Sequence, residues 1–126
     1  MTGTPVLDAS AVLALLQEEA GADEVEGLLD GALMSCVNLS EVLQKAEQHG
    51  VRTEGLEYDL EALGVEFRDF GLAMARATAR TWSRGTDLSL GDRACIALAA
   101  DVEGTAVATD ARWADAGIDV ELRLLR

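Results

Sequence analysis

Basic side chains are scarce in this 126-residue chain. Lys and Arg together number 10 against 23 Asp and Glu, which gives a formal net charge of −13. Domains that hold nucleic acid by charge usually carry a basic footprint, so simple electrostatic binding is excluded as the main mode of action. Activity on a polyanion therefore requires metal ions, a local basic strip or a basic partner.

The chain has a single histidine, His49, and a single lysine, Lys45. A Ser-His-Asp or Cys-His system has to use a histidine, and His49 precedes Gly50 at an expected helix end, where it suits the helix dipole. A receiver-type aspartyl-phosphate domain needs a lysine at a late strand end, whereas Lys45 lies in a predicted helix. No GxxxxGK[ST] and no strand-linked GxGxxG is present, so a glycine-rich loop that cradles a nucleotide is absent.

Cysteine and aromatic residues are also few. Cys36 and Cys95 lie in apolar stretches without a CxxC, so we expect reduced core residues in a cytosolic protein. The opening residues lack a basic n-region, and no apolar run approaches the roughly 20 residues needed to span a membrane. With 49% hydrophobic but only 4% aromatic residues, residues 1–126 are expected to form one cytoplasmic domain with an aliphatic core.

Short apolar segments alternate with helical ones along the chain. Helical spacing of apolar residues predicts helices over 9–19, 22–30, 38–49, 53–63, 71–84 and 90–103, and a helical turn over 111–116. Short runs of β-branched and apolar residues predict strands at 6–7, 32–36, 65–70, 105–109 and 120–124. This alternation favours an α/β fold with a mostly parallel sheet and helices on both faces.

Four carboxylates occupy the points where a strand gives way to a helix: Asp8, Glu41, Asp92 and Asp110. In a parallel sheet these points converge on one edge. Carboxylates that share a pocket repel one another, and a hard divalent cation such as Mg²⁺ or Mn²⁺ relieves that repulsion. A pocket of this kind usually handles phosphodiesters.

Each of these acids also has a simpler interpretation as a helix cap. Glu41 follows Asn38, and Asp92 follows Ser89, with the spacing of a capping box. Asp8 and Asp110 stand where an acid suits a helix N-terminus. Ordinary caps more often use Ser, Thr and Asn, so four acids in four such places point toward a site. Composition and spacing alone support a metal site and a set of caps about equally.

Four segments resemble the motifs of PIN-domain nucleases, in the same order along the chain. Val6-Leu7-Asp8-Ala9-Ser10 resembles their opening motif, and Asn38-Leu39-Ser40-Glu41-Val42 resembles the second. The segment Leu88-Ser89-Leu90-Gly91-Asp92-Arg93-Ala94-Cys95-Ile96-Ala97-Leu98-Ala99 is very similar to the third, and Ala108-Thr109-Asp110-Ala111-Arg112-Trp113 is similar to the fourth. The nearest group is the VapC-type toxins of bacterial toxin–antitoxin pairs.

The resemblance implies a PIN-like α/β/α sandwich with a mostly parallel sheet of four to five strands. It also implies a Mg²⁺- or Mn²⁺-dependent endoribonuclease that cleaves RNA, forms a homodimer and is silenced by a cognate antitoxin. It carries over the four acids as the catalytic and metal-binding quartet, with Asp8 and Asp92 as direct ligands. It further suggests supporting or substrate-contacting roles for Ser10, Asn38, Thr109 and Asp115. Two alternatives remain: a metal-free PIN-like scaffold that only binds protein, and a DNA nuclease on the same fold.

A candidate RNA-binding strip lies in the second half of the chain. Arg76, Arg80 and Arg84 are spaced four apart, so they line one face of the helix predicted over 71–84, and Arg93 is close in sequence. The alternative is a solvated face whose arginines pair with acids on neighbouring helices. By contrast, residues 18–61 contain only Lys45 and Arg52 as basic residues. We expect that acidic stretch to receive a basic antitoxin segment, whose arginine pairs with the quartet.

Overall fold

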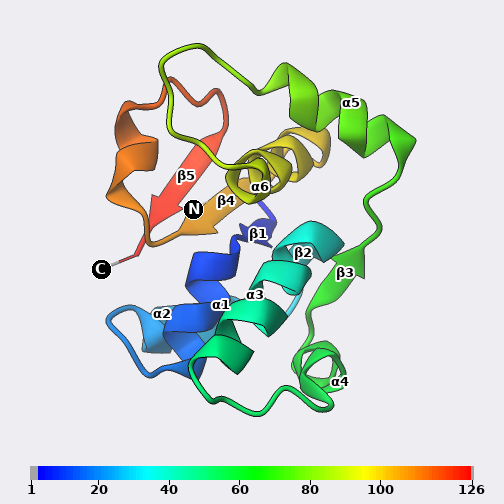
Figure 1. The fold of residues 1–126 in the computed structure, drawn as a ribbon, viewed down its shortest axis with the longest axis vertical. Helices are drawn as coiled ribbons and strands as arrows, with labels where there is room; N and C mark the ends of the chain where they lie inside the picture. The colour runs from blue at the N-terminus through cyan, green and yellow to red at the C-terminus, as the bar shows by residue number, and fades with distance from the viewer. Residues whose placement is uncertain (1–2, 126) are drawn as a thin grey trace.

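Five parallel strands form the central sheet in the computed structural model, which describes residues 3–125 (Figure 1). Their order across the sheet is β3-β2-β1-β4-β5, and every neighbouring pair is parallel. The strands are β1 (Pro5–Leu7), β2 (Leu33–Ser35), β3 (Glu66–Arg68), β4 (Thr105–Ala108) and β5 (Glu121–Leu124). The prediction of a mostly parallel sheet of four to five strands is confirmed.

Helices cover both faces of this sheet. They are α1 (Ala9–Leu16), α2 (Ala22–Leu28), α3 (Cys36–Gln48), α4 (Leu56–Ala62), α5 (Leu72–Arg80), α6 (Leu90–Asp101) and the 3₁₀ helix η1 (Ala111–Asp115). Side chains alternate across a strand, so Leu7 packs with residues of α1 to α4, whereas Val6 packs with α6 and with Trp113 of η1. The two apolar clusters lie on opposite faces of the sheet, which gives the α/β/α arrangement.

Burial on both faces explains the composition of the central strands. All residues of β2 and β4 are buried, as expected of a parallel sheet covered by helices on each side. Cys95 lies in this core, whereas Cys36 begins α3 and is only half-buried; both thiols are free. The expectation of reduced cysteines therefore holds for both residues, while a core position holds for Cys95 alone.

Two helix boundaries differ from prediction in ways that affect the site. Helix α3 begins at Cys36, because the Ser35 hydroxyl accepts a hydrogen bond from the backbone N–H of Val37 at 3.2 Å and caps the helix. Asn38 and Glu41 consequently lie inside α3, and the prediction that they form its capping box is wrong. Their side chains are free to serve another purpose.

Helix α5 ends at Arg80, four residues earlier than predicted. The Thr81 hydroxyl donates a 2.7 Å hydrogen bond to the carbonyl of Thr78, which satisfies one of the last carbonyls of the helix. Residues 81–89 form an irregular segment that leads into α6. Arg84 therefore lies in this segment, and the prediction that it shares a helical face with Arg76 and Arg80 is wrong.

The order of the strands locates a crevice. Strand β1 lies between β2 and β4, so the chain continues to one side of β1 through β2 and β3 and to the other side through β4 and β5. In sheets with such a reversal of strand order, ligands bind at the carboxyl ends of the strands beside it. Asp8 follows β1 directly, α3 follows β2 directly, and Asp110 comes two residues after β4. Within residues 3–125, no helix has the length and apolar character needed to cross a membrane.

Candidate active site

A cavity of about 270 Å³ lies at this edge of the sheet and brings the four predicted acids together. Asp8, Glu41, Asp92 and Asp110 all line it. They come from four segments separated by at least 18 residues in sequence. The further charged and polar residues around the cavity are Ser10, Lys45, Asp87, Ser89 and Arg112.

Asp8 is the most deeply placed of the four acids, with only 4% of its surface exposed. Its Oδ2 accepts hydrogen bonds from the Ser10 hydroxyl at 2.6 Å and from the Ser10 backbone N–H at 3.1 Å. Burial nevertheless raises the pKa of Asp8 to about 6, and the charges of Asp92 and Glu41 add to this rise. A carboxylate whose charge is so poorly compensated gains most from a nearby cation.

Ser10 also ties two strand ends together. Its hydroxyl oxygen accepts a 3.1 Å hydrogen bond from the backbone N–H of Thr109, just beyond β4, while the hydroxyl donates to Asp8, just beyond β1. Ser10 and Thr109, the two hydroxyl residues predicted beside the acids, are thus joined by a hydrogen bond between the Thr109 backbone and the Ser10 side chain. This connection fixes the direction of the Asp8 carboxylate.

The side-chain amide of Asn38 bridges two of the acids. Its Nδ2 is 3.4 Å from Asp8 Oδ1, 3.3 Å from Glu41 Oε1 and 3.0 Å from the carbonyl oxygen of Gly91. Asn38 is fully buried, and its Oδ1 has no hydrogen-bond partner in the part of the chain that the structure describes. The three acceptors around Nδ2 fix the amide orientation, so Asn38 holds two repelling carboxylates close together.

Glu41 lies against the first turn of α6 because residue 91 has no side chain. A Cβ placed on Gly91 would be 2.0 Å from Oε1 of Glu41, far inside any allowed contact. The Gly91 backbone has an ordinary helical conformation, so the glycine is required here for space. The packing of α3 on α6 thereby positions the Glu41 carboxylate.

Three of the acids serve as helix caps as well as cavity walls. Asp8 accepts from the N–H of Ser10, Asp110 accepts from the N–H of Arg112 at 2.9 Å, and Asp92 forms a reciprocal capping box with Ser89. The predicted Ser89–Asp92 box is confirmed. Glu41 caps nothing. The cap interpretation therefore holds for Asp8, Asp92 and Asp110, and the same three residues also line the cavity.

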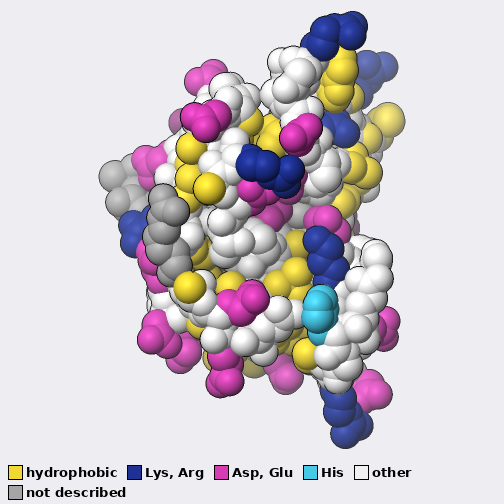
Figure 2. Space-filling model, turned by 60° about the vertical axis from the view of Figure 1, so that its left-hand side comes forward, with side chains coloured by type: hydrophobic (Ala, Val, Ile, Leu, Met, Phe, Trp, Pro, Cys, Tyr) yellow, Lys and Arg dark blue, Asp and Glu magenta, His cyan; other side chains and the backbone are white. Residues whose placement is uncertain are grey.

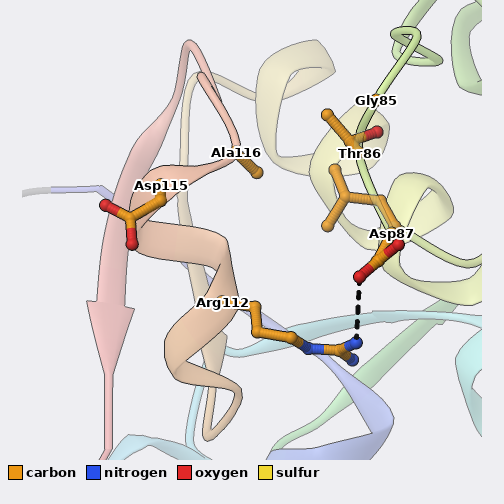
Figure 3. A pocket seen from close by; sticks show the side chains of 7 residues that line it. Gly85, Thr86, Asp87, Arg112, Asp115 and Ala116 are labelled. Atoms are coloured by element: carbon orange, nitrogen blue, oxygen red, sulfur yellow. Dashed lines mark ion pairs between the residues drawn. The ribbon is translucent and has the colours of Figure 1, made fainter.

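Asp110 is paired with an arginine of its own segment. Arg112 donates from Nε to Asp110 Oδ1 at 3.1 Å and from Nη2 to Oδ2 at 2.7 Å, and its Nη1 is 3.9 Å from Asp87 Oδ2 (Figure 3). Hydrogen bonding by Arg112 lowers the pKa of the Asp110 carboxyl. The same pairing raises the pKa of the guanidinium. A cationic side chain thus lies at the rim of the acidic cavity.

Sequence reasoning missed Arg112, Asp87 and Lys45 as cavity residues. Lys45 is four residues after Glu41 on α3, a spacing that places two side chains on the same face of a helix. Arg112 follows Asp110 by two residues at the start of a helical turn. Both spacings can be recognised in the sequence. No spacing pattern indicates Asp87, because it lies in the irregular 81–89 segment.

The remaining predicted residues lie outside the acidic cavity. Asp115 lines a neighbouring hollow of about 220 Å³, and its carboxylate points away from Arg112 (Figure 3). Arg93 donates from Nη1 to the Thr78 carbonyl at 3.3 Å, so it packs against α5. Arg76, Arg80 and Arg84 are exposed and do not line this cavity.

The donor chemistry of the cavity fits a hard divalent cation. The carboxylate oxygens that line it are the ligands that Mg²⁺ and Mn²⁺ prefer. As the side chains stand, no three His, Cys, Asp or Glu within residues 3–125 are arranged to hold a metal ion. The reason lies in their present partners: Asp92 is turned to Ser89, and Asp110 to Arg112. Cation binding at these acids thus requires Asp92 and Asp110 to turn from these partners.

The fold and the cavity define an α/β protein with an acidic ligand-binding cavity at the switch point of a parallel sheet. The family model for the PIN domain matches residues 6–119, and the chain therefore belongs to the PIN domain family. Its five parallel strands and six α-helices agree with the PIN-like α/β/α fold. PIN domains have a nuclease fold and are typically metal-dependent nucleases. A search of curated proteins gives no match to the chain.

Proposed function

We propose that this PIN domain is a VapC-type toxin, a cytoplasmic endoribonuclease that uses Mg²⁺ or Mn²⁺ and is neutralised by a cognate antitoxin. The observation that carries the proposal is the convergence of Asp8, Glu41, Asp92 and Asp110 on one cavity, with Asp8 buried and its charge poorly compensated. Homodimer formation belongs to the same proposal and comes from the resemblance to VapC-type toxins.

The acids would hold the cation, with Asp8 and Asp92 as direct ligands and Glu41 and Asp110 completing the shell. Activation of water and stabilisation of the leaving 3′ oxygen are the chemistry that a bound divalent cation supplies in phosphodiester cleavage. The chain's own contribution is to keep Asp8 ionised and aligned through Ser10 and to hold Glu41 beside it through Asn38. The His49 Nδ1 donates to the Lys45 carbonyl oxygen at 2.8 Å, and His49 does not line the cavity, so it is not available as a base.

The antitoxin part of the proposal is supported by charge. A hollow lined mostly by α2 and the turn before it carries five acids: Glu18, Glu19, Asp23, Glu24 and Glu26. A basic partner segment suits this surface. Asp110 already accepts a bidentate guanidinium from Arg112, so an arginine supplied by the antitoxin would find the same geometry and would exclude the cation.

Cleavage of total bacterial RNA by the purified protein tests the nuclease. We expect discrete products with Mn²⁺, none with EDTA, and none from Asp8→Asn or Asp92→Asn. Asp101→Asn is the matched control, because Asp101 is an exposed acid on the same helix as Asp92 and does not line the cavity. Undiminished cleavage by both cavity variants would contradict the assignment.

One observation favours the metal-free scaffold: no three acids are arranged to hold a metal ion as the side chains of residues 3–125 stand. A ligand that binds only the native state raises the melting temperature. Mn²⁺ should therefore raise the Tm of the protein and leave that of Asp8→Asn almost unchanged. An equal Tm with and without Mn²⁺ would support the scaffold, and equal cleavage of single-stranded DNA and RNA would support the DNA nuclease.

A further inference from the structure

The irregular segment between α5 and α6 presents an aromatic side chain to solvent. Trp82 is 57% exposed, whereas the other tryptophan, Trp113, is 1% exposed. The guanidinium carbon of Arg84 lies 5.8 Å from the centroid of the Trp82 ring, within the range of a cation–π contact. An exposed indole beside an arginine is a surface on which a planar, electron-rich ring can stack.

The segment that contains Trp82 is basic in an otherwise acidic chain, although Asp119 also lines the hollow at Trp82. Residues 70–86 contain three arginines and no acid, against a net charge of −13 for the whole sequence. Between residues 3 and 125, none of the ion pairs involves Arg76, Arg80 or Arg84. The structure thus shows these arginines exposed and, among the residues it describes, without the acidic partners that the alternative gave them, which leaves a solvated face or a binding strip. Basic side chains gather at the top of the view in Figure 2, the level at which α5 lies in Figure 1.

Three hollows with shared lining residues, of which the acidic cavity is one, lie between the four acids and this basic region. The cavity shares Asp87 and Arg112 with the neighbouring hollow of about 220 Å³ (Figure 3). That hollow shares Leu88 and Ala116 with a third one of about 430 Å³, which Trp82 also lines. Neighbouring hollows therefore follow one another from the four acids, past Arg112, to Trp82.

We propose that single-stranded RNA follows this path, with the cleaved phosphodiester at the acids and an unstacked base stacked on Trp82. The inference rests on the proposed function and names how that site holds its substrate. Base–aromatic stacking supplies affinity without sequence reading and requires a base that is free of a duplex. Arg84 and Arg80 neutralise backbone phosphates beside the stacked base. Between Trp82 and the four acids, Arg112 lowers the repulsion between the RNA phosphates and the carboxylates. The path explains how an acidic protein retains a polyanion.

Binding is tested in the Asp92→Asn background, which removes cleavage, with a fluorescein-labelled mixed-sequence RNA about 12 nucleotides long. We expect saturable quenching of tryptophan emission with the Kd given by fluorescence anisotropy. Trp82→Ala should weaken binding by about tenfold and abolish the quenching, and Trp82→Phe should restore affinity to within about threefold. Arg84→Gln should reduce the slope of log K against log salt concentration by roughly 0.7. A duplex of equal length should compete poorly.

Tyr58→Ala is the matched control, since Tyr58 is a second exposed aromatic residue, on α4, and lines none of the three hollows. Unchanged affinity in Trp82→Ala, or equal loss in Tyr58→Ala, would overturn the path. If the protein with Asp92 intact cleaves RNA while Trp82→Ala binds normally, the nuclease stands and the path falls. If it binds RNA with Trp82 quenching but cleaves none with Mn²⁺, the path stands and the nuclease falls.

Discussion

Arg112 holds Asp110 through two parallel hydrogen bonds and directs its remaining nitrogen toward Asp87. The guanidinium therefore occupies both oxygens of the Asp110 carboxylate at the rim of the cavity. A cation bound to Asp110, as proposed above, would have to compete with Arg112 for this carboxylate. Pairs of this kind on an exposed surface are weak, which makes the competition easy to reverse.

Removing the Arg112 charge should tighten metal binding. Arg112→Gln frees Asp110 and removes a positive charge from the rim, so the Kd for Mn²⁺ should fall by about threefold at low salt. Isothermal titration calorimetry measures the change. The matched control is Arg52→Gln, because Arg52 pairs with Glu54 over the same sequence spacing at 3.1 Å and does not line the cavity. An equal change in both variants would show that only net charge matters.

A methyl group at position 91 should damage the site without damaging the fold. The Cβ of Gly91→Ala would displace the Glu41 carboxylate, which is the flexible end of a long side chain. We expect Mn²⁺ affinity to fall by about tenfold or more, while the free energy of unfolding changes by less than about 1 kcal/mol. Gly27→Ala is the control, since Gly27 lies within α2 and no atom is within 4 Å of the added methyl group. Undisturbed metal affinity in Gly91→Ala would contradict the role given to Glu41.

Burial of Asp8 should make the metal-free protein less stable as the pH rises. The pKa of Asp8 is about 6 in the native state against an ordinary 3.8, so between these values the native state binds more protons than the unfolded chain. The free energy of unfolding therefore falls as pH rises through this window and levels off above it. The contribution is up to about 3 kcal/mol.

Urea unfolding in EDTA at about pH 4 and about pH 7.5 measures this effect. Other acids titrate in the same range, so the informative quantity is the pH dependence of the wild type minus that of Asp8→Asn. We expect the wild type to lose more stability over this interval than the variant. Identical slopes would show that Asp8 is ionised at no cost.

The Asn38 amide should matter most when its neighbours are charged. Asn38→Leu preserves volume but leaves Asp8 and Glu41 facing each other without a donor between them. We expect a loss of roughly 1–3 kcal/mol in the free energy of unfolding at neutral pH, and a smaller loss in acid, where Asp8 is protonated. Chemical denaturation at both pH values measures it. An equal loss of unfolding free energy at neutral and at acid pH would show that Asn38 contributes through packing alone.

Sequence patterns identified the sheet and the four acids because both depend on local signals. Each strand is a short apolar run bounded by turn residues, and parallel pairing follows from the alternation with helices. The acids could be placed on one edge because the carboxyl ends of parallel strands converge there. Asp8 is an example: its position directly after β1 was enough to place it at this edge of the sheet.

The start of α3 and the end of α5 were predicted wrongly because single hydroxyl groups decide them. Ser35 and Asn38 are both good caps, and only the backbone position after β2 selects Ser35. At α5, arginine and alanine favour helix on both sides of Thr81, and the turn there prevails. Arg112 differs, because its pairing with Asp110 two residues away could have been inferred locally, whereas its contact with Asp87 joins segments 25 residues apart and no local pattern records it.

The double duty of Asp8, Asp92 and Asp110 leaves a signature for reading relatives that have lost activity. Asparagine or serine at positions 8 and 110 still caps a helix, whereas alanine there forfeits about 1 kcal/mol, and the acid at position 92 completes the capping box of Ser89. Glu41 caps no helix, and its carboxylate packs against Gly91, so helix stability does not require a polar side chain at position 41. In relatives that have lost activity, we therefore expect substitutions first at positions 41 and 91. Polar residues at positions 8, 92 and 110 should be retained for longer, because they still stabilise helix N-termini.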